Sequence, residues 1–259
     1  MNLDLSGRTA LVGGASRGIG RASAKVLAGM GARVIATGRT GELLESLLDE
    51  LAGPVPHAAL VVDYDDPDAV VAAVQAHLAD GPINILVNNT GGPPGGEIID
   101  AQGEAFEAGF RRHVLVGQRL VQLLTSGMIE ARYGRIINIV STSVREPIPG
   151  LGVSNTIRAA VAGWAKTLAT ELGPHEITIN NVLPGFTDTE RLEQIIAARA
   201  AKAGVEEADV AAAMRGSIPF GRFADATEVA NLLGFLASPA ASYVSGQSIA
   251  ADGGRMVSI

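Results

Sequence analysis

A glycine-rich run near the N-terminus has the residue types and spacing of a phosphate-binding loop. It directly follows a β-branched segment at 9–12 and leads into an Ala-rich, helical segment. Glycines allow a sharp turn and bring backbone N–H groups close to a phosphate at a helix N-terminus. The alternative is a tight strand-to-helix turn with a purely structural role. The residues predicted to contact a nucleotide here are Gly14, Ser16, Arg17, Gly18, Ile19 and Gly20.

The second β-branched segment indicates which nucleotide the loop binds. An NAD site offers a carboxylate about 20 residues after the loop, which binds the ribose 2′-OH. Here the segment ends in Thr37-Gly38-Arg39, without an acidic residue. Arg17 and Arg39 can pair with a 2′-phosphate, unless both are ordinary surface arginines. The sequence therefore favours NADP(H) over NAD(H), with Asp63 as a predicted acceptor for the adenine amino group.

Composition excludes several other kinds of chemistry. The chain has 259 residues, no Cys, 27 acidic against 20 basic side chains and a net charge of −7. Disulfides, thiolate metal sites and Cys nucleophiles are therefore excluded, and a nucleic-acid surface is disfavoured. The four His residues form no metal-binding pair, so we expect no metal site.

The longest uncharged run, 229–251, has the length of a membrane span. It is interrupted by Asn231, Pro239 and Gln247, so we interpret it as a helix, a turn and a strand. The N-terminus shows no signal peptide. We therefore expect a soluble, cytoplasmic protein with no membrane and no nucleic-acid partner.

The elements that must position these residues alternate along the chain. Strands are predicted at 9–12, 33–37, 60–62, 83–87, 135–140 and 177–182, and the helices between them include 20–29, 66–79 and 105–132. Nearly continuous apolar strands joined by helices predict an α/β fold: a single doubly wound, Rossmann-type domain over 1–259, with a parallel sheet flanked by helices. In this fold, ligands bind beyond the carboxyl ends of the strands.

Four motifs in this order resemble the short-chain dehydrogenase/reductase family. They are the loop glycines, Asn88-Asn89-Thr90-Gly91, Leu183-Pro184-Gly185 and a closing segment at 246–254. The resemblance covers about 5–254 and implies that Asn89, Gly91 and Thr187 contact the cofactor. It also implies a substrate lid at about 187–218, with a helical run at 190–203.

The family resemblance also implies an oligomer. Family members commonly form a homodimer or homotetramer through two long helices beside the active site. Trp164 and Leu168 follow the catalytic segment on one of these helices. They are either part of such a contact or packed inward.

The family's catalytic Asn-Ser-Tyr-Lys tetrad is altered in this chain. Its Ser corresponds to Ser141, which follows the predicted strand at 135–140. Ser154 stands where the Tyr is expected, Arg158 where the Lys is expected, and His113 where the Asn is expected. The other tyrosines and the lysines lie elsewhere in the pattern; they are Tyr64, Tyr133, Tyr243, Lys25, Lys166 and Lys202.

These replacements change the chemistry that the resemblance implies. A Ser hydroxyl is a far weaker acid than the family's activated phenol, although it can still donate a hydrogen bond to a carbonyl. Arg158 keeps a positive charge and can bind the nicotinamide ribose, but a guanidinium relays protons poorly. His113, with an unperturbed pKa near 6.5, is a candidate proton donor through water, with Ser141 and Ser154 orienting the carbonyl. The alternative is that His113 fills the gap between helix and strand.

Beyond Ser141, Arg145 is a candidate for contacting an anionic substrate group, or else a solvated loop arginine. Together, these features predict an NADP(H)-dependent oxidoreductase that interconverts a small-molecule carbonyl and an alcohol with atypical catalytic residues. Two alternatives stay open: a non-catalytic nucleotide-binding sensor or subunit, and a lyase or isomerase on the same scaffold.

Overall fold

One parallel sheet organises the chain in a computed structural model, which describes residues 1–258. Its strand order is β3-β2-β1-β4-β5-β6-β7. The chain crosses back between β3 and β4, so the carboxyl ends of β1 and β4 border the switch point at which doubly wound sheets bind ligands. The predicted fold class is confirmed. The strands are β1 Thr9–Val12, β2 Arg33–Gly38, β3 Ala58–Val61, β4 Ile85–Asn88, β5 Gly134–Ile139, β6 Ile177–Pro184 and β7 Ser248–Ala251.

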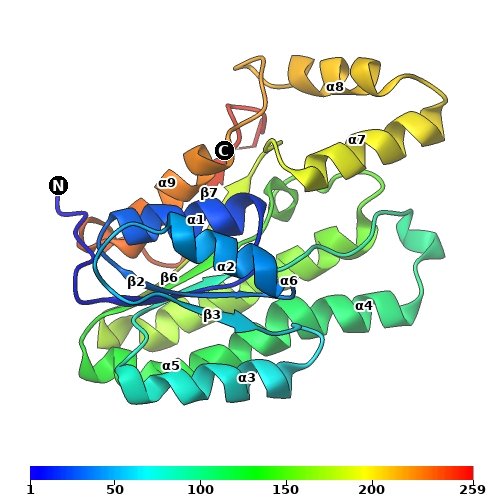
Figure 1. Cartoon of the computed structure of the whole chain (residues 1–259). Helices are drawn as coiled ribbons and strands as arrows, with labels where there is room; N and C mark the ends of the chain where they lie inside the picture. The colour runs from blue at the N-terminus through cyan, green and yellow to red at the C-terminus, as the bar shows by residue number, and fades with distance from the viewer. Residues whose placement is uncertain (259) are drawn as a thin grey trace.

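Helices cover both faces of the sheet, as apolar strands require (Figure 1). On one face, α1, α2 and α9 contribute Leu27, Leu47 and Leu233 to a buried core; on the other, α3, α5 and α6 contribute residues such as Val74 and Leu124. The helices are α1 Gly18–Gly29, α2 Gly41–Glu50, α3 Pro67–Ala76, α4 Gly103–Phe110, α5 Val116–Glu130, α6 Gly152–Leu172, α7 Glu190–Ala203, α8 Glu207–Gly216 and α9 Ala226–Ala237.

The helix predicted over 105–132 is interrupted. It divides into α4, a π-helical turn at Arg111–Leu115 and α5. A π turn adds a residue to the helical repeat and so shifts the direction of the side chains on either side. Apolar periodicity continues through the turn, which is why the sequence pattern did not reveal it. The predicted helix at 190–203 coincides with α7, and the run at 229–251 forms the end of α9, a short turn and β7.

A chain of hydrogen-bonded polar side chains crosses the four strands from β4 to β7. Asn88 Nδ2 donates to Asn138 Oδ1 at 2.8 Å, and Asn138 Nδ2 donates to Asn181 Oδ1 at 2.8 Å. Asn181 Nδ2 then donates to Ser248 Oγ at 3.0 Å. These residues are paired in register on β4, β5, β6 and β7. Because each buried amide is satisfied by its neighbour, the chain fixes the relative height of the four strands below the cleft.

The segment that contains α7 and α8 is a helical excursion whose two ends are joined by backbone hydrogen bonds. The Asp188 N–H donates to the Ala224 carbonyl at 2.8 Å, and the Ala224 N–H donates to the Phe186 carbonyl at 2.9 Å. Between these bonds, α7 and α8 extend beyond the sheet, at the upper right of Figure 1. They have their own small core of Leu192, Ile196 and Met214.

Helix α6 packs inward along much of its length. Leu168 is only 8% exposed and belongs to the core beneath the sheet, so the inward alternative holds for this residue. The Trp164 Nε1–H donates to Gln118 Oε1 on α5 at 2.7 Å. Within residues 1–258, none of the helices combines the length and apolar character needed to cross a membrane.

Candidate active site

A cleft of about 540 Å³ runs along the carboxyl ends of β1, β4, β5 and β6. The structure brings to it all the residues predicted to contact the cofactor, together with Ser141, Ser154 and Arg158. His113 is the one predicted site residue that lies behind this cleft. The predicted cofactor residues in the lining are Gly14, Ser16, Arg17, Gly18, Ile19, Gly20, Arg39, Asp63, Asn89, Gly91 and Thr187.

The glycine loop is shaped by close backbone packing. Gly14 and Gly18 have φ of +56° and +51°, which side-chain-bearing residues rarely adopt. A Cβ on Gly20 would lie 2.1 Å from the Gly14 carbonyl oxygen. The Asn89 side chain donates to the Gly13 carbonyl at 3.0 Å, which ties the loop after β4 to the loop after β1. Helix α1 begins at Gly18 with no side-chain cap, so the loop leads directly into a helix N-terminus.

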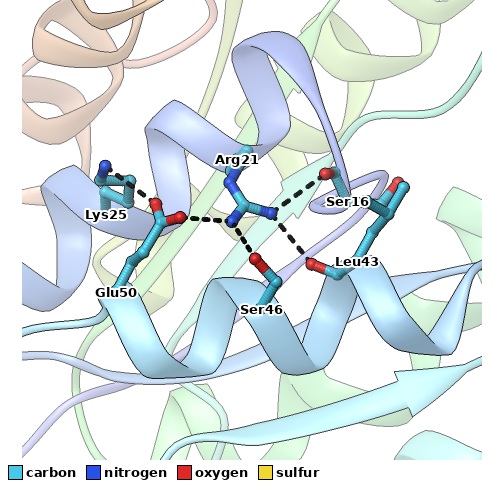
Figure 2. A network of polar contacts seen from close by, with 6 residues as sticks. All are labelled: Ser16, Arg21, Lys25, Leu43, Ser46 and Glu50. Atoms are coloured by element: carbon cyan, nitrogen blue, oxygen red, sulfur yellow. Dashed lines mark hydrogen bonds and ion pairs between the residues drawn. The ribbon is translucent and has the colours of Figure 1, made fainter.

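Arg21 joins the glycine loop to α2, as Figure 2 shows. Its Nη1 donates to the carbonyls of Ser16 and Leu43 at 3.3 and 2.9 Å. Its Nη2 donates to Ser46 Oγ at 3.1 Å and to Glu50 Oε1 at 2.7 Å. Because Arg39 lies two residues before α2, this network helps to set the spacing between the glycine loop and Arg39. The sequence analysis did not identify Arg21, since a lone arginine on a helix carries no motif.

The two arginines predicted to bind a 2′-phosphate differ in their partners. Arg17 is about half exposed and forms an ion pair with Glu190 at the start of α7. Arg39 is exposed and forms no ion pair within residues 1–258. Asp63 lies in the same half of the cleft, where its Oδ1 accepts from the Asp65 N–H at 3.0 Å.

Tyr64 and Arg112 are cleft residues that the sequence analysis did not assign. Tyr64 is buried, and its hydroxyl lies 2.9 Å from Thr37 Oγ1 beside the glycine loop. Burial raises the pKa of this phenol, whose oxygen would lie 2.8 Å from an added Cβ on Gly13. Arg112 is ion-paired with Asp65, which holds the pKa of that carboxyl below its usual range. Tyr64 follows β3 by three residues, a spacing that could have indicated it, whereas Arg112 lies in the π-helical turn and has no comparable signal.

The opposite half of the cleft holds Ser141, Ser154 and Arg158, three of the four residues predicted to be catalytic. Ser141 follows β5, and its Oγ accepts from the Ser143 N–H at 3.1 Å. Ser154 lies in the first turn of α6 and Arg158 one turn later, so both side chains share one face of the helix. Arg158 Nη1 donates to the Ile139 carbonyl at 2.9 Å. Burial, followed by the nearby charge of Arg191, lowers the pKa of Arg158 to about 10, so it is protonated at neutral pH.

The lysines and the tyrosines other than Tyr64 lie outside the lining of the cleft. Of the described residues that line the cleft, none is a lysine and Tyr64 is the only tyrosine. Lys166 donates instead to the Gly246 carbonyl at 3.3 Å, and the Tyr133 hydroxyl donates to the Ala237 carbonyl at 2.6 Å.

His113 lies in the π-helical turn and is 9% exposed. It faces a small cavity of about 10 Å³ behind the main cleft, where its Nε2 has no hydrogen-bond partner. Burial, and then the charge of Arg158, lowers the pKa of His113 to about 3. The folded protein therefore moves the pKa of His113 well below the unperturbed value of 6.5 that made it a candidate proton donor. At neutral pH this imidazole carries no proton to donate as an imidazolium.

No group of three or more His, Cys, Asp or Glu side chains within residues 1–258 is arranged to hold a metal ion.

A family model and several known proteins match this chain over nearly its whole length. The family model described as enoyl-(acyl carrier protein) reductase matches residues 14–255. The chain is 35% identical to a 3-oxoacyl-[acyl-carrier-protein] reductase of Pseudomonas aeruginosa, covering 99% of this chain and 100% of that protein. It is 35% identical to D-erythrulose reductase of Gallus gallus, over 99% of each chain.

A solved structure agrees with these sequence relatives. L-sorbose reductase from Gluconobacter frateurii, crystallised with NADPH and L-sorbose, matches with a TM-score of 0.91 and 29% identity over the full length of both chains. The same order of motifs, the same sheet and near-complete coverage of the relatives lead to one conclusion. The chain belongs to the short-chain dehydrogenase/reductase family.

Proposed function

We propose that this protein is an NADP(H)-dependent oxidoreductase that interconverts a small-molecule carbonyl and an alcohol, with Ser154 and Arg158 in place of the family's Tyr and Lys. The observation that carries the proposal is the single cleft in which the glycine loop and Arg39 lie at one end and Ser141, Ser154 and Arg158 at the other. The relatives include a protein named an NADPH-dependent reductase from Bacillus subtilis, 32% identical over 98% of this chain.

The residues present fit NADP(H). The absence of side chains at Gly14 and Gly18 leaves the backbone N–H groups of the loop open to a pyrophosphate at the N-terminus of α1. Arg39 has no carboxylate partner among the described residues and supplies a cation for the 2′-phosphate. Arg17 supplies a second contact from Nη2, because only its Nη1 is paired with Glu190. When bound, the cofactor supplies or accepts a hydride at the substrate carbon.

The chain's own residues orient and polarise the substrate. Ser141 and Ser154 donate hydrogen bonds to the substrate oxygen, and Arg158 stabilises negative charge as it develops on that oxygen during reduction. Neither serine hydroxyl is acidic enough to protonate an alkoxide rapidly, so water entering the open cleft supplies the proton. His113, neutral and behind the cleft, fills the space between the π turn and β5. The excursion from 187 to 218 acts as the substrate lid, because α7 carries several cleft-lining residues.

A titration with NADPH and with NADH, followed by nicotinamide fluorescence, tests this assignment without a substrate. Arg39→Gln should weaken NADPH binding roughly 10- to 100-fold and leave NADH binding unchanged, because one charge-assisted contact to the 2′-phosphate is lost. Arg199→Gln, on α7 but outside the cleft, is the matched control. Failure of folded wild-type protein to bind either nucleotide would contradict the proposal.

The second candidate function is nucleotide binding without turnover, which the absence of a lysine and of a tyrosine beside Ser154 favours. The two are separated by incubating the NADPH-bound protein with a panel of ketones and aldehydes and following nicotinamide absorbance.

We also propose a homo-oligomer; exposed Phe110 and Leu115, beside α5, provide an apolar surface for it. Light scattering coupled to gel filtration measures the mass of the particle.

A further inference from the structure

The cleft contains more positive charge than its own carboxylates compensate. Arg17 and Arg112 form ion pairs with Glu190 and Asp65. The other arginines in the lining, Arg39, Arg158 and Arg191, form no ion pair within the described part of the chain. Of these three, the proposed 2′-phosphate accounts for Arg39. The other two, Arg191 and Arg158, lie at the opposite end of the cleft, where Arg158 also faces the proposed position of the substrate oxygen.

These two guanidiniums come from different elements and each lies against the same loop. Arg158, on α6, lies against Gly92, where an added Cβ would be 3.3 Å from Nη2. Arg191, in the first turn of α7, donates from Nη2 to the Pro93 carbonyl at 3.1 Å. Gly92 and Pro93 are adjacent, so the two cations flank a single dipeptide. Its glycine leaves the space beside Arg158 Nη2 open.

The protein partners of both guanidiniums are neutral. Arg158 donates to the Ile139 carbonyl, and Arg191 donates to the Pro93 carbonyl and, at 3.5 Å, to Gln194 Oε1. The only carboxylates that line the described cleft belong to Asp63 and Glu190. Asp63 lies at the other end of the cleft, and Glu190 is paired with Arg17. Two like charges near each other, one of them buried, are unfavourable unless an anion joins them.

The walls around this pair are apolar. Leu151, Phe186, Leu192 and Ile195 line the same end of the cleft. A ligand that fits here has an anionic oxygen group for the guanidiniums and an apolar or short body beside it. A planar guanidinium pairs with a carboxylate or with a phosphate in a two-pronged contact.

We propose that Arg158 and Arg191 form an anion-binding subsite, and that the substrate is a carbonyl compound, or the corresponding alcohol, that carries a carboxylate or phosphate group. This inference rests on the proposed function and specifies its substrate class. Arg145, the arginine that the sequence suggested for such a role, is outside the lining of the cleft, because its Nη2 donates to the Ser248 carbonyl at 2.8 Å. Arg191 takes that role instead, since the lid helix brings it over the substrate end.

Calorimetric titration of the NADP⁺-loaded protein tests the subsite without turnover. In each of two pairs of probes, one member carries the anionic group and the other has it masked or absent: 4-methyl-2-oxopentanoate against its methyl ester, and dihydroxyacetone phosphate against dihydroxyacetone. We expect the charged member of one pair to bind roughly 10- to 100-fold more tightly than its neutral partner. The pair that shows the difference identifies carboxylate or phosphate as the group recognised.

Arg191→Gln assigns the preference to this subsite. It should remove most of the difference between the charged and neutral probes, while Arg199→Gln, on the same helix outside the cleft, should retain it. Equal binding of both members of both pairs, or binding of none of the four at up to about 10 mM, overturns the inference. So does an Arg191→Gln variant that loses NADP⁺ affinity and keeps the probe preference.

A prior NADP⁺ titration separates this outcome from failure of the proposed function. If NADP⁺ does not bind, the proposed function itself fails. If NADP⁺ binds and the charged probes are not preferred, only the anion subsite fails.

Discussion

The two ends of the cleft are built in different ways. The glycine-loop end depends on backbone: left-handed glycines, a helix N-terminus and an Asn89 amide bonded to the Gly13 carbonyl. The Ser154–Arg158 end depends on side chains that extend from α6 into the cleft and are held by a few hydrogen bonds. Backbone shape tolerates almost no added atoms, whereas side-chain chemistry can be exchanged on an unchanged frame. This contrast is consistent with our proposal that the cleft retains a phosphate-binding loop while Ser154 and Arg158 replace other catalytic groups.

Gly20→Ala should produce the largest effect at the loop end. The new Cβ would overlap the Gly14 carbonyl and approach Asn89 Nδ2 at 2.7 Å, so the loop must move. We expect a loss of NADPH affinity of at least about 100-fold and a loss of stability of about 1 to 3 kcal/mol, typical of overpacking. Fluorescence titration and urea unfolding measure the two effects.

Gly29→Ala is the control on the same helix, because nothing lies within 4 Å of its added Cβ. It should leave nucleotide binding unchanged and stabilise α1 slightly. Equal NADPH affinity in the Gly20 variant and the wild type would show that the loop is not constrained by its backbone.

Arg158→Met should have the next largest effect, and this effect should be confined to turnover at the Ser154–Arg158 end of the cleft. The substitution removes the cation proposed to stabilise charge on the substrate oxygen, so kcat should fall roughly 100-fold while NADPH affinity changes less than about threefold. Lys166→Met, two turns further along α6 and bonded to Gly246, is the control and should leave both quantities unchanged. A parallel loss of NADPH affinity would mean that Arg158 belongs to the cofactor site.

The same contrast explains what the sequence could predict. The glycine loop, the strands and the helix at 190–203 are encoded by neighbouring residues, so local patterns identified them. Gly14 and Ser141 could be placed because each follows a strand whose carboxyl end faces the cleft. The position of Arg191 in the same cleft as Arg158 depends on where the excursion of α7 and α8 leaves and rejoins the fold, which no local pattern encodes. The burial of His113 depends on a π turn within a continuous apolar periodicity.

His113→Asn should change stability more than catalysis. The lowered pKa of about 3 means that the folded state stays unprotonated where the unfolded state, with a pKa near 6.5, binds a proton. The contribution of neutral His113 to the free energy of unfolding is therefore fully present above pH 6.5 and is lost as the pH falls towards 3. Between pH 6.5 and 5, the free energy of unfolding of the wild type should fall by about 1 to 2 kcal/mol more than that of the variant.

Urea titrations of both proteins across this range measure the difference, and other groups cancel in the comparison. The pH profile of kcat should be the same for both proteins between pH 5.5 and 8. This range lies well above the pKa of about 3 that His113 has in the folded protein. A shifted profile in the variant would restore His113 as a proton donor. Parallel stability curves would instead show that His113 is hydrated in the folded state.

Arg21→Met should have the smallest effect and tests whether the loop end is also held by side chains. The substitution breaks the contacts of Figure 2 between the glycine loop and α2, so Arg39 is no longer fixed relative to the loop. We expect the KM for NADPH to rise about three- to fivefold with kcat unchanged, because positioning is lost and no contact to the substrate is. The KM for NADH should change less, since Arg39 has no 2′-phosphate to meet. Lys25→Met, which removes only the outer bond to Glu50, is the control and should leave both KM values unchanged. If Arg21→Met raises both KM values equally, the network supports the whole loop and not the spacing to Arg39.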